Sequence, residues 1–183
     1  MGKRERTRAR IQACALDLFE RHGFDQTTVT QIAAAAGVTE MTCYRHFPAK
    51  ELIVLDDPYD PLITAAVAKQ ARSLAPVARV VNGLRLAWGQ LPEPAGDIVR
   101  RRVRIVAGSP TLRAAAFRNN AGTEQLVAAQ LMADGVPALP ARVAAVVPLA
   151  AITAALFEWS EQPDGRLGDA IMTALDTVEG RHG

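Results

Sequence analysis

The chain has 183 residues, of which 49% are hydrophobic and 22% are charged, so the composition excludes a mainly disordered protein. Only 5% of the residues are aromatic, and Ala, Val and Leu carry the apolar fraction, which favours helices over a β-sandwich. The net charge of +2 does not by itself indicate a nucleic-acid partner. Residues 1–55, however, hold eight Lys or Arg against six Asp or Glu, whereas the remainder holds 13 of each sign. The whole positive excess therefore lies in the first 55 residues, most densely in a basic arm at residues 3–10.

Export and membrane insertion are not expected. No apolar stretch follows the basic N-terminal run, as it would in a secretory signal. The longest uncharged run, residues 143–157, has 15 residues, fewer than the ~20 that a membrane-spanning helix needs, so we expect a buried helix there. Cys14 and Cys43 have no CxxC partner and are expected to be reduced thiols. We therefore predict a cytoplasmic protein with no membrane attachment, no metal and no cofactor.

The first helix is predicted over about residues 6–22. Apolar residues recur there at helical spacing on one face, and Gly23 ends the helix. Its stripe consists of Ile11, Cys14, Ala15, Leu18, Phe19 and His22.

Two short helices joined by a tight turn are predicted next. Thr27 or Thr28 caps the first of them, Gly37 suits the left-handed turn position that follows, and Thr39 caps a helix over residues 40–47. A further helix begins near residue 49. Such a pair is a helix-turn-helix, whose second helix can enter the major groove of DNA.

The segment TTVTQIAAAAGVTEMTCYRHFPAKELI resembles the DNA-binding signature of the TetR family of bacterial transcriptional regulators, and the preceding ALDLFERHGFDQTTV matches the family's first helix and turn. The resemblance covers about residues 6–55. It implies an all-α fold, with a helix-turn-helix DNA-binding domain at residues 1–55 and a helical effector-binding and dimerisation domain at residues 56–183. The matching residues are Thr28, Ile32, Ala33, Ala36, Gly37, Val38, Thr39, Thr42, Tyr44, His46, Phe47, Lys50 and Leu52.

The same resemblance implies two sets of DNA contacts. Thr28, Thr39, Tyr44 and Lys50 would touch phosphates, while Glu40, Met41, Thr42, Arg45 and His46 would lie at or near base edges. His46 fits a plain surface position equally well. Three residues depart from the family pattern: Glu40 where a basic residue is frequent, Met41 where a small one is, and Cys43 where a larger apolar one is usual. Glu40 either accepts a hydrogen bond from a cytosine amine or caps the helix at its positive end, and Met41 can meet a thymine methyl.

Six helices are predicted after a proline-rich linker at residues 56–61. The fifth is apolar nearly all round, so we expect it to be buried on several sides and kinked at Pro148. The resemblance implies that the last two long helices form the four-helix bundle of a homodimer. The predicted ranges are residues 62–74, 77–90, 96–107, 111–133, 141–161 and 167–179.

A regulator of this kind needs an effector pocket, and its candidate lining residues are scarce aromatic or apolar side chains on different helices. Each also fits the hydrophobic core. In the run Arg100, Arg101, Arg102 and Arg104, at least one guanidinium is expected to point inward or at a carboxylate. Residues 102–113 and 154–159 are similar to an actinobacterial TetR subclass associated with acyl-CoA-like ligands, as in mycofactocin-system regulators, which implies an acyl-type effector. The candidates are Leu84, Trp88, Val103, Val106, Phe117, Leu131 and Trp159.

Two other classes compete with a regulator. An enzyme is disfavoured, because the sequence holds no HExxH, GxSxG, P-loop, GxGxxG or paired-cysteine motif. The second is a TetR-like helical small-molecule-binding protein with weak or lost operator binding. We predict a repressor that a small hydrophobic effector releases from a palindromic operator.

Overall fold

A computed structural model of the chain describes residues 2–55, 60–91 and 97–181, and these residues form ten helices without a strand. The fold is therefore all-α, as predicted. The chain divides into two compact units. The head unit comprises Met1–Asp56 and Asp97–Phe117, and the body unit comprises Asp57–Gly96 and Arg118–Gly183. The head unit thus takes in residues 97–117, which the sequence prediction gave to the C-terminal domain.

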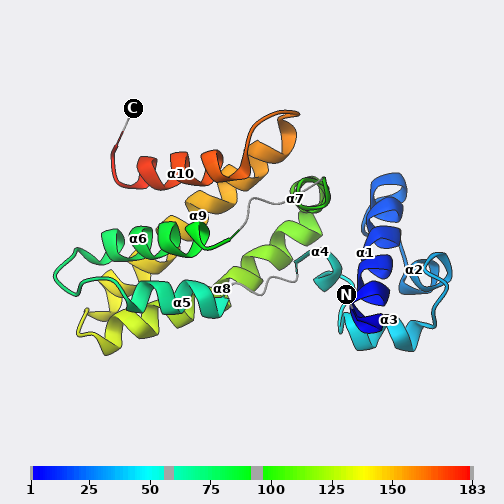
Figure 1. Cartoon of the computed structure of the whole chain (residues 1–183), viewed down its shortest axis with the longest axis horizontal. Helices are drawn as coiled ribbons and strands as arrows, with labels where there is room; N and C mark the ends of the chain where they lie inside the picture. Colours follow the sequence, from blue (N-terminus) through cyan, green and yellow to red (C-terminus); the bar gives the residue numbers. More distant parts are fainter. Residues whose placement is uncertain (1, 56–59, 92–96, 182–183) are drawn as a thin grey trace. The chain divides into compact units, whose positions relative to one another are not determined.

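The head unit is built around its long first helix. This helix packs against the second, fourth and seventh helices, and the second helix packs in turn against the third (Figure 1). Ile11, Leu16 and Ile32 are fully buried between them. The helices are α1 (Lys3–His22), α2 (Val29–Ala35), α3 (Glu40–His46), α4 (Leu52–Leu55) and α7 (Ile98–Gly108).

Local caps explain where these helices begin. Thr28 and Gln31 form a capping box at α2, in which each side chain bonds to the backbone amide of the other (3.2 and 2.8 Å). Thr39 Oγ1 accepts from the amide of Thr42 at 3.2 Å and starts α3. Gly37, at φ +60°, makes the left-handed turn between the two helices. The caps at Thr28 and Thr39 are where the sequence predicted them.

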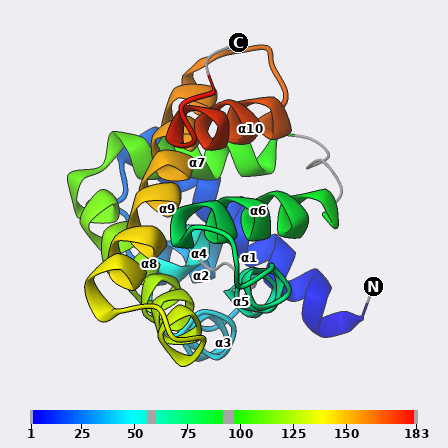
Figure 2. The same ribbon diagram turned by 90° about the vertical axis from the view of Figure 1, so that its left-hand side faces the viewer.

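The body unit packs its helices around α6 (Pro76–Gly89). This helix lies against α5 (Asp60–Ala68), α9 (Ala138–Glu161) and α10 (Leu167–Val178) (Figure 2). Helix α8 (Pro110–Ala133) supplies its first turns to the head unit and the rest to the body unit. The helix α5 ends earlier than the predicted residue 74. The backbone amide of Gln70 donates to the carbonyl of Val67 (3.1 Å), and its side-chain amide donates to the carbonyl of Ala66 (3.1 Å).

The structure corrects the prediction for α9. The helix begins at Ala138, since Pro140 falls in the first turn, where no amide donor is needed. It buries one face instead of several: Val143 and Val147 are 47% and 43% exposed. Among the described helices α9 is the one that is long and apolar enough to cross a membrane by length and composition, a test that core helices of soluble proteins also pass.

Candidate nucleic-acid interface

The helix α3 shows the surface that a DNA-reading helix needs. Met41 is 69% exposed and Tyr44 is 45% exposed. Glu40 and Arg45 are exposed as well, while Thr42 and His46 are half-buried. On the opposite face Cys43 is buried, so it anchors the helix. The side chains that the sequence assigned to base edges are thus on or beside the outer face of one short helix.

Hydrogen bonds hold several of these side chains in place. Thr39 Oγ1 and Thr42 Oγ1 lie 3.0 Å apart, and Arg45 Nη2 donates to Thr42 Oγ1 at 3.0 Å. Thr30, on α2, donates from Oγ1 to Glu40 Oε1 at 2.7 Å. Side chains fixed before DNA arrives lose less conformational entropy on binding. Thr30 was not among the predicted site residues, because its partner Glu40 belongs to another helix.

The Lys50 ammonium lies inside the head unit. It donates to the carbonyl oxygens of Phe24 and Thr27, both at 2.8 Å, and stands 4.0 Å from the centroid of the Phe24 ring. Burial lowers the pKa of Lys50. Two of its three N–H donors are therefore used to fasten the turn between α1 and α2. The predicted phosphate contact would have to use the third.

Cationic side chains gather around the end of α3. Arg8 donates to the carbonyl of His46, and its guanidinium lies 3.9 Å from the centroid of the Phe47 ring. Burial lowers the pKa of His46, and the nearby guanidinium groups of Arg4, Arg8 and Arg45 lower it further. This part of the head unit therefore has a positive potential, which attracts phosphate.

Both cysteines are free thiols, and Cys43 lies in the core of the head unit. Cys43 is 2% exposed, and burial and the neighbouring Glu40 raise the pKa of its thiol. Such a thiol is protonated and unreactive at neutral pH. Cys14 is also free. Within residues 2–55, 60–91 and 97–181, no cluster of three or more His, Cys, Asp or Glu could hold a metal ion.

The arginine run on α7 ties that helix to the rest of the head unit. Arg101 bonds Asp17 at 2.5 Å and both carboxylate oxygens of Glu20 at 2.6 and 2.7 Å. These bonds to two carboxylates raise the pKa of Arg101 further. Arg102 donates twice to the carbonyl of Val54, at 2.7 and 3.0 Å. The prediction that at least one of these guanidinium groups points inward or at a carboxylate is confirmed by Arg101.

The seven effector-pocket candidates fall in both units. Val103, Val106 and Phe117 belong to the head unit, and the other four to the body unit. Leu84, Val106, Leu131 and Trp159 are buried, Trp88 and Val103 are half-buried, and Phe117 is 74% exposed. Trp159 Nε1 donates to the carbonyl of Gly165 at 3.0 Å and so closes the turn before α10.

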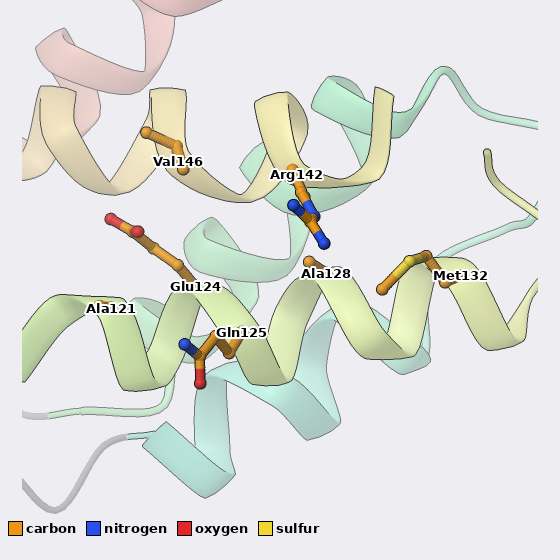
Figure 3. Close-up of a pocket in the computed structure, with 7 residues that line it drawn as sticks. All are labelled: Ala121, Glu124, Gln125, Ala128, Met132, Arg142 and Val146. Atoms are coloured by element: carbon orange, nitrogen blue, oxygen red, sulfur yellow. The ribbon is translucent and has the colours of Figure 1, made fainter. Parts of the chain in front are cut away.

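A groove of about 520 Å³ lies between α8 and α9 of the body unit. Figure 3 shows Glu124 extending from α8 and Arg142 from α9 into the space between the two helices. The two side chains form no ion pair with each other or with any other described residue. None of the seven predicted pocket residues lines this groove. Its described lining is Ala121, Glu124, Gln125, Ala128, Met132, Arg142 and Val146.

Comparison with known families matches both parts of the chain. Residues 11–56 match the family of bacterial regulatory proteins described as the tetR family, and residues 74–183 match the MftR C-terminal domain. A candidate mycofactocin biosynthesis transcriptional regulator, MftR of Mycobacterium tuberculosis, is 27% identical over 127 residues, which is 69% of this chain and 64% of that protein. The HTH-type transcriptional regulator TcmR of Streptomyces glaucescens is 30% identical over 125 residues, 64% of this chain and 55% of that protein. The matches thus span less than two thirds of either relative.

Solved structures share the fold. NalD of Pseudomonas aeruginosa, the secondary repressor of the MexAB-OprM multidrug efflux pump, superposes with a TM-score of 0.61 at 24% identity over 98% of both chains. SmeT, the repressor of the Stenotrophomonas maltophilia multidrug efflux pump SmeDEF, superposes with a TM-score of 0.59 at 20% identity, over 94% of this chain and 88% of that one. At these identities the likeness establishes the fold and no more.

Proposed function

The chain belongs to the TetR family of bacterial transcriptional regulators and is therefore not an enzyme; from this we propose that it is a ligand-responsive repressor that binds a palindromic operator as a homodimer. One observation carries the DNA-binding part of the proposal. Helix α3 is capped by Thr39, anchored by Cys43 and exposes Glu40, Met41, Tyr44 and Arg45 together. Such a short helix presents too few side chains to specify an operator, whereas a twofold dimer doubles the bases that are read.

The body unit supports dimer formation. Leu126 on α8 is 50% exposed, and Leu139, Val143 and Val147 on α9 are 73%, 47% and 43% exposed. Leu139, Val143 and Val147 recur at every fourth residue and so lie along one side of α9, and apolar side chains gathered on one side of an exposed helix are typical of a protein interface. The groove between these helices holds one unpaired carboxylate and one unpaired guanidinium, Glu124 and Arg142. In a twofold interface each Arg142 can meet the Glu124 of the second copy.

An effector is proposed to bind the body unit. Residues 74–183, most of which belong to this unit, match the MftR C-terminal domain, and SmeT, which shares the fold, forms a complex with triclosan. We therefore propose a small hydrophobic effector, of which an acyl-type molecule is one example. The dimer is proposed to have two states that differ in the spacing of its DNA-binding heads, and only one spacing fits the operator. The effector shifts the equilibrium between them by binding one state more tightly than the other. We place the protein in the cytoplasm, where its operator lies.

The first experiment measures operator binding. Duplexes from the neighbourhood of the gene are titrated with the full-length protein by fluorescence anisotropy at several salt concentrations. We expect one palindromic fragment to bind about 10³-fold or more tightly than the others, with affinity falling as salt rises. Equal binding to all fragments, or none, would exclude the repressor and favour a helical small-molecule-binding protein without an operator.

The second experiment tests the dimer by charge exchange. Glu124→Arg or Arg142→Glu alone places like charges together and should weaken the dimer at least about tenfold. The double variant restores opposite charges and should recover most of the affinity. Arg166→Glu, an equal charge change at an exposed position of the body unit, is the control. Sedimentation equilibrium gives the dissociation constants, and single and double variants that match the unmodified protein would rule out this interface.

A further inference from the structure

We propose that Glu40 selects a cytosine in each operator half-site, and that Thr30 is the positioning residue that aims its carboxylate. This inference rests on the proposed operator binding and adds the chemical identity of one base in the site. The first observation is that an acidic side chain, Glu40, occupies the exposed start of α3, although the DNA proposed to bind there carries a negatively charged phosphate backbone. A carboxylate loses hydration there and is repelled by phosphates, so it must gain a strong donor to be compatible with binding.

The structure discriminates between the two roles left open by the sequence. Helix capping is performed by Thr39, whose Oγ1 accepts from the amide of Thr42 at 3.2 Å. Glu40 turns its Oε1 toward α2 instead, where Thr30 Oγ1 donates to it at 2.7 Å. No cation pairs with Glu40 among the described residues. One oxygen of the carboxylate is thus fixed to the neighbouring helix, and the other remains available to accept.

Base chemistry then narrows the target. An ionised carboxylate only accepts hydrogen bonds. In the major groove guanine offers two acceptors, thymine an acceptor and a methyl group, and adenine a donor beside the acceptor N7. Cytosine alone presents its N4 amine without an acceptor on the same base. An acceptor-only side chain therefore favours cytosine over the other three bases.

A second hydrogen-bonded pair lies within α3 and involves a side chain of opposite charge, Arg45. Arg45 Nη2 donates to Thr42 Oγ1 at 3.0 Å, which leaves the other donors of the fork for guanine O6 and N7. Each charged side chain on the exposed part of α3 is therefore held by a threonine hydroxyl, Glu40 by Thr30 and Arg45 by Thr42. Glu40 and Arg45 would specify different base pairs.

The test is selection of operators from a random duplex library with the unmodified full-length protein and with Glu40→Gln, Glu40→Ala and Thr30→Val. The unmodified protein should select a cytosine at symmetric positions of a palindrome. Glu40→Gln should move the preference there toward adenine, since an amide both donates and accepts. Glu40→Ala should lower the preference for cytosine about tenfold. Glu161→Gln, which removes the same charge from the body unit, should leave the selected sequence unchanged.

Two further measurements distinguish base recognition by Glu40 from the positioning role of Thr30. Thr30→Val should weaken the cytosine preference alone, and Thr30→Ser, which restores the hydroxyl, should recover it. An operator in which a 2-pyrimidinone nucleoside, which lacks the N4 amine, replaces that cytosine should bind the unmodified protein about tenfold more weakly and Glu40→Ala no more weakly.

The outcomes separate this inference from the proposed function. Selection of one palindrome by all variants, with the same base at every position, overturns the role of Glu40 and leaves the repressor standing. A uniform rise in affinity of Glu40→Ala for all sequences also overturns it, because the carboxylate would then only repel phosphate. Failure of the unmodified protein to select any sequence overturns both.

Discussion

The head and body units differ in what they leave exposed. In the head unit, the exposed part of α3 carries charged and hydroxyl side chains already bonded to one another, as in the pairs Thr30–Glu40 and Thr42–Arg45. In the body unit, α8 and α9 expose aliphatic side chains such as Leu126 and Leu139 beside two unpaired charges. A fixed polar surface suits base edges and phosphates, whereas an apolar one suits another protein surface.

The two units also differ in the partners of the cations that lie inside them. In the body unit Arg79 is 1% exposed and bonds Asp134 at 2.6 Å, while Arg72 reaches the other carboxylate oxygen at 2.7 Å. The bond from Arg79 lowers the pKa of Asp134, so this carboxylate stays ionised. The pair joins α6 to the turn after α8. The buried cation of the body unit thus pairs with a carboxylate, whereas the Lys50 ammonium of the head unit donates to two backbone carbonyls.

The largest expected effect tests how tightly the body unit is packed. A Cβ at Gly83 would lie 2.8 and 2.9 Å from the backbone Cα and N of Val67, so Gly83→Ala must push α5 and α6 apart. We expect it to lower the free energy of unfolding by about 3 kcal/mol. Gly89→Ala is the matched control on the same helix, since nothing lies within 4 Å of its added Cβ. Urea unfolding followed by circular dichroism measures both, and equal stability of the two variants would show that α5 yields.

A smaller effect is expected at Lys50 in the head unit. Lys50→Met removes the ammonium that bonds the carbonyls of Phe24 and Thr27, and should cost about 1–2 kcal/mol of stability. Lys3→Met, in the exposed basic arm, should leave the stability unchanged and only weaken DNA binding. Unfolding curves and anisotropy titrations are measured for both variants.

The salt dependence then decides whether Lys50 also touches phosphate. A phosphate contact lowers the slope of log affinity against log salt by about one. If Lys50→Met keeps the stability of the unmodified protein but lowers the slope of log affinity against log salt by about one, the ammonium contacts phosphate and does not hold the turn. That result would contradict the internal role inferred from its hydrogen bonds.

The helix caps and the long-range bonds of the head unit show which contacts a sequence predicts and which it does not. The caps Thr28 and Thr39 depend on residues within one turn, so local pattern located them. The bonds of Lys50 join residues 23 and 26 positions apart, and the contact of Arg101 with Asp17 spans 84. No local pattern encodes such pairs, so the packing of α7 against the head unit could not be predicted from the sequence.

Helix α9 illustrates the same limit for burial. Its composition indicated burial on several sides, yet Leu139 and Val143 are exposed. The hydropathy of a helix indicates that its side chains favour burial, but it does not indicate which protein surface buries them. Hydropathy could not assign the seven pocket candidates for the same reason, because the same apolar side chains occur in a protein core, in a ligand pocket and in a subunit interface.

The smallest effect is a pH dependence at the end of α3. Burial and the guanidinium groups of Arg4, Arg8 and Arg45 hold the pKa of His46 below its ordinary value of 6.5. A bound phosphate would stabilise the imidazolium and raise that pKa, so the complex binds more protons than the free protein. Operator affinity should therefore rise as pH falls from 7.5 to 5.5, by about two- to threefold per head, below the limit of about tenfold per pH unit that the uptake of one proton sets.

Stability should change in the opposite direction over the same interval. A histidine whose pKa is lowered on folding stabilises the protein fully above its unfolded value of about 6.5, and this contribution is lost as the pH falls through the folded pKa. Anisotropy at constant ionic strength and thermal unfolding follow the two quantities. His46→Gln should abolish both trends, and His22→Gln, at the exposed end of α1, should abolish neither. A pH-independent affinity in the unmodified protein, with the stability trend intact, would place His46 away from the phosphate and confine its role to the fold of the head unit.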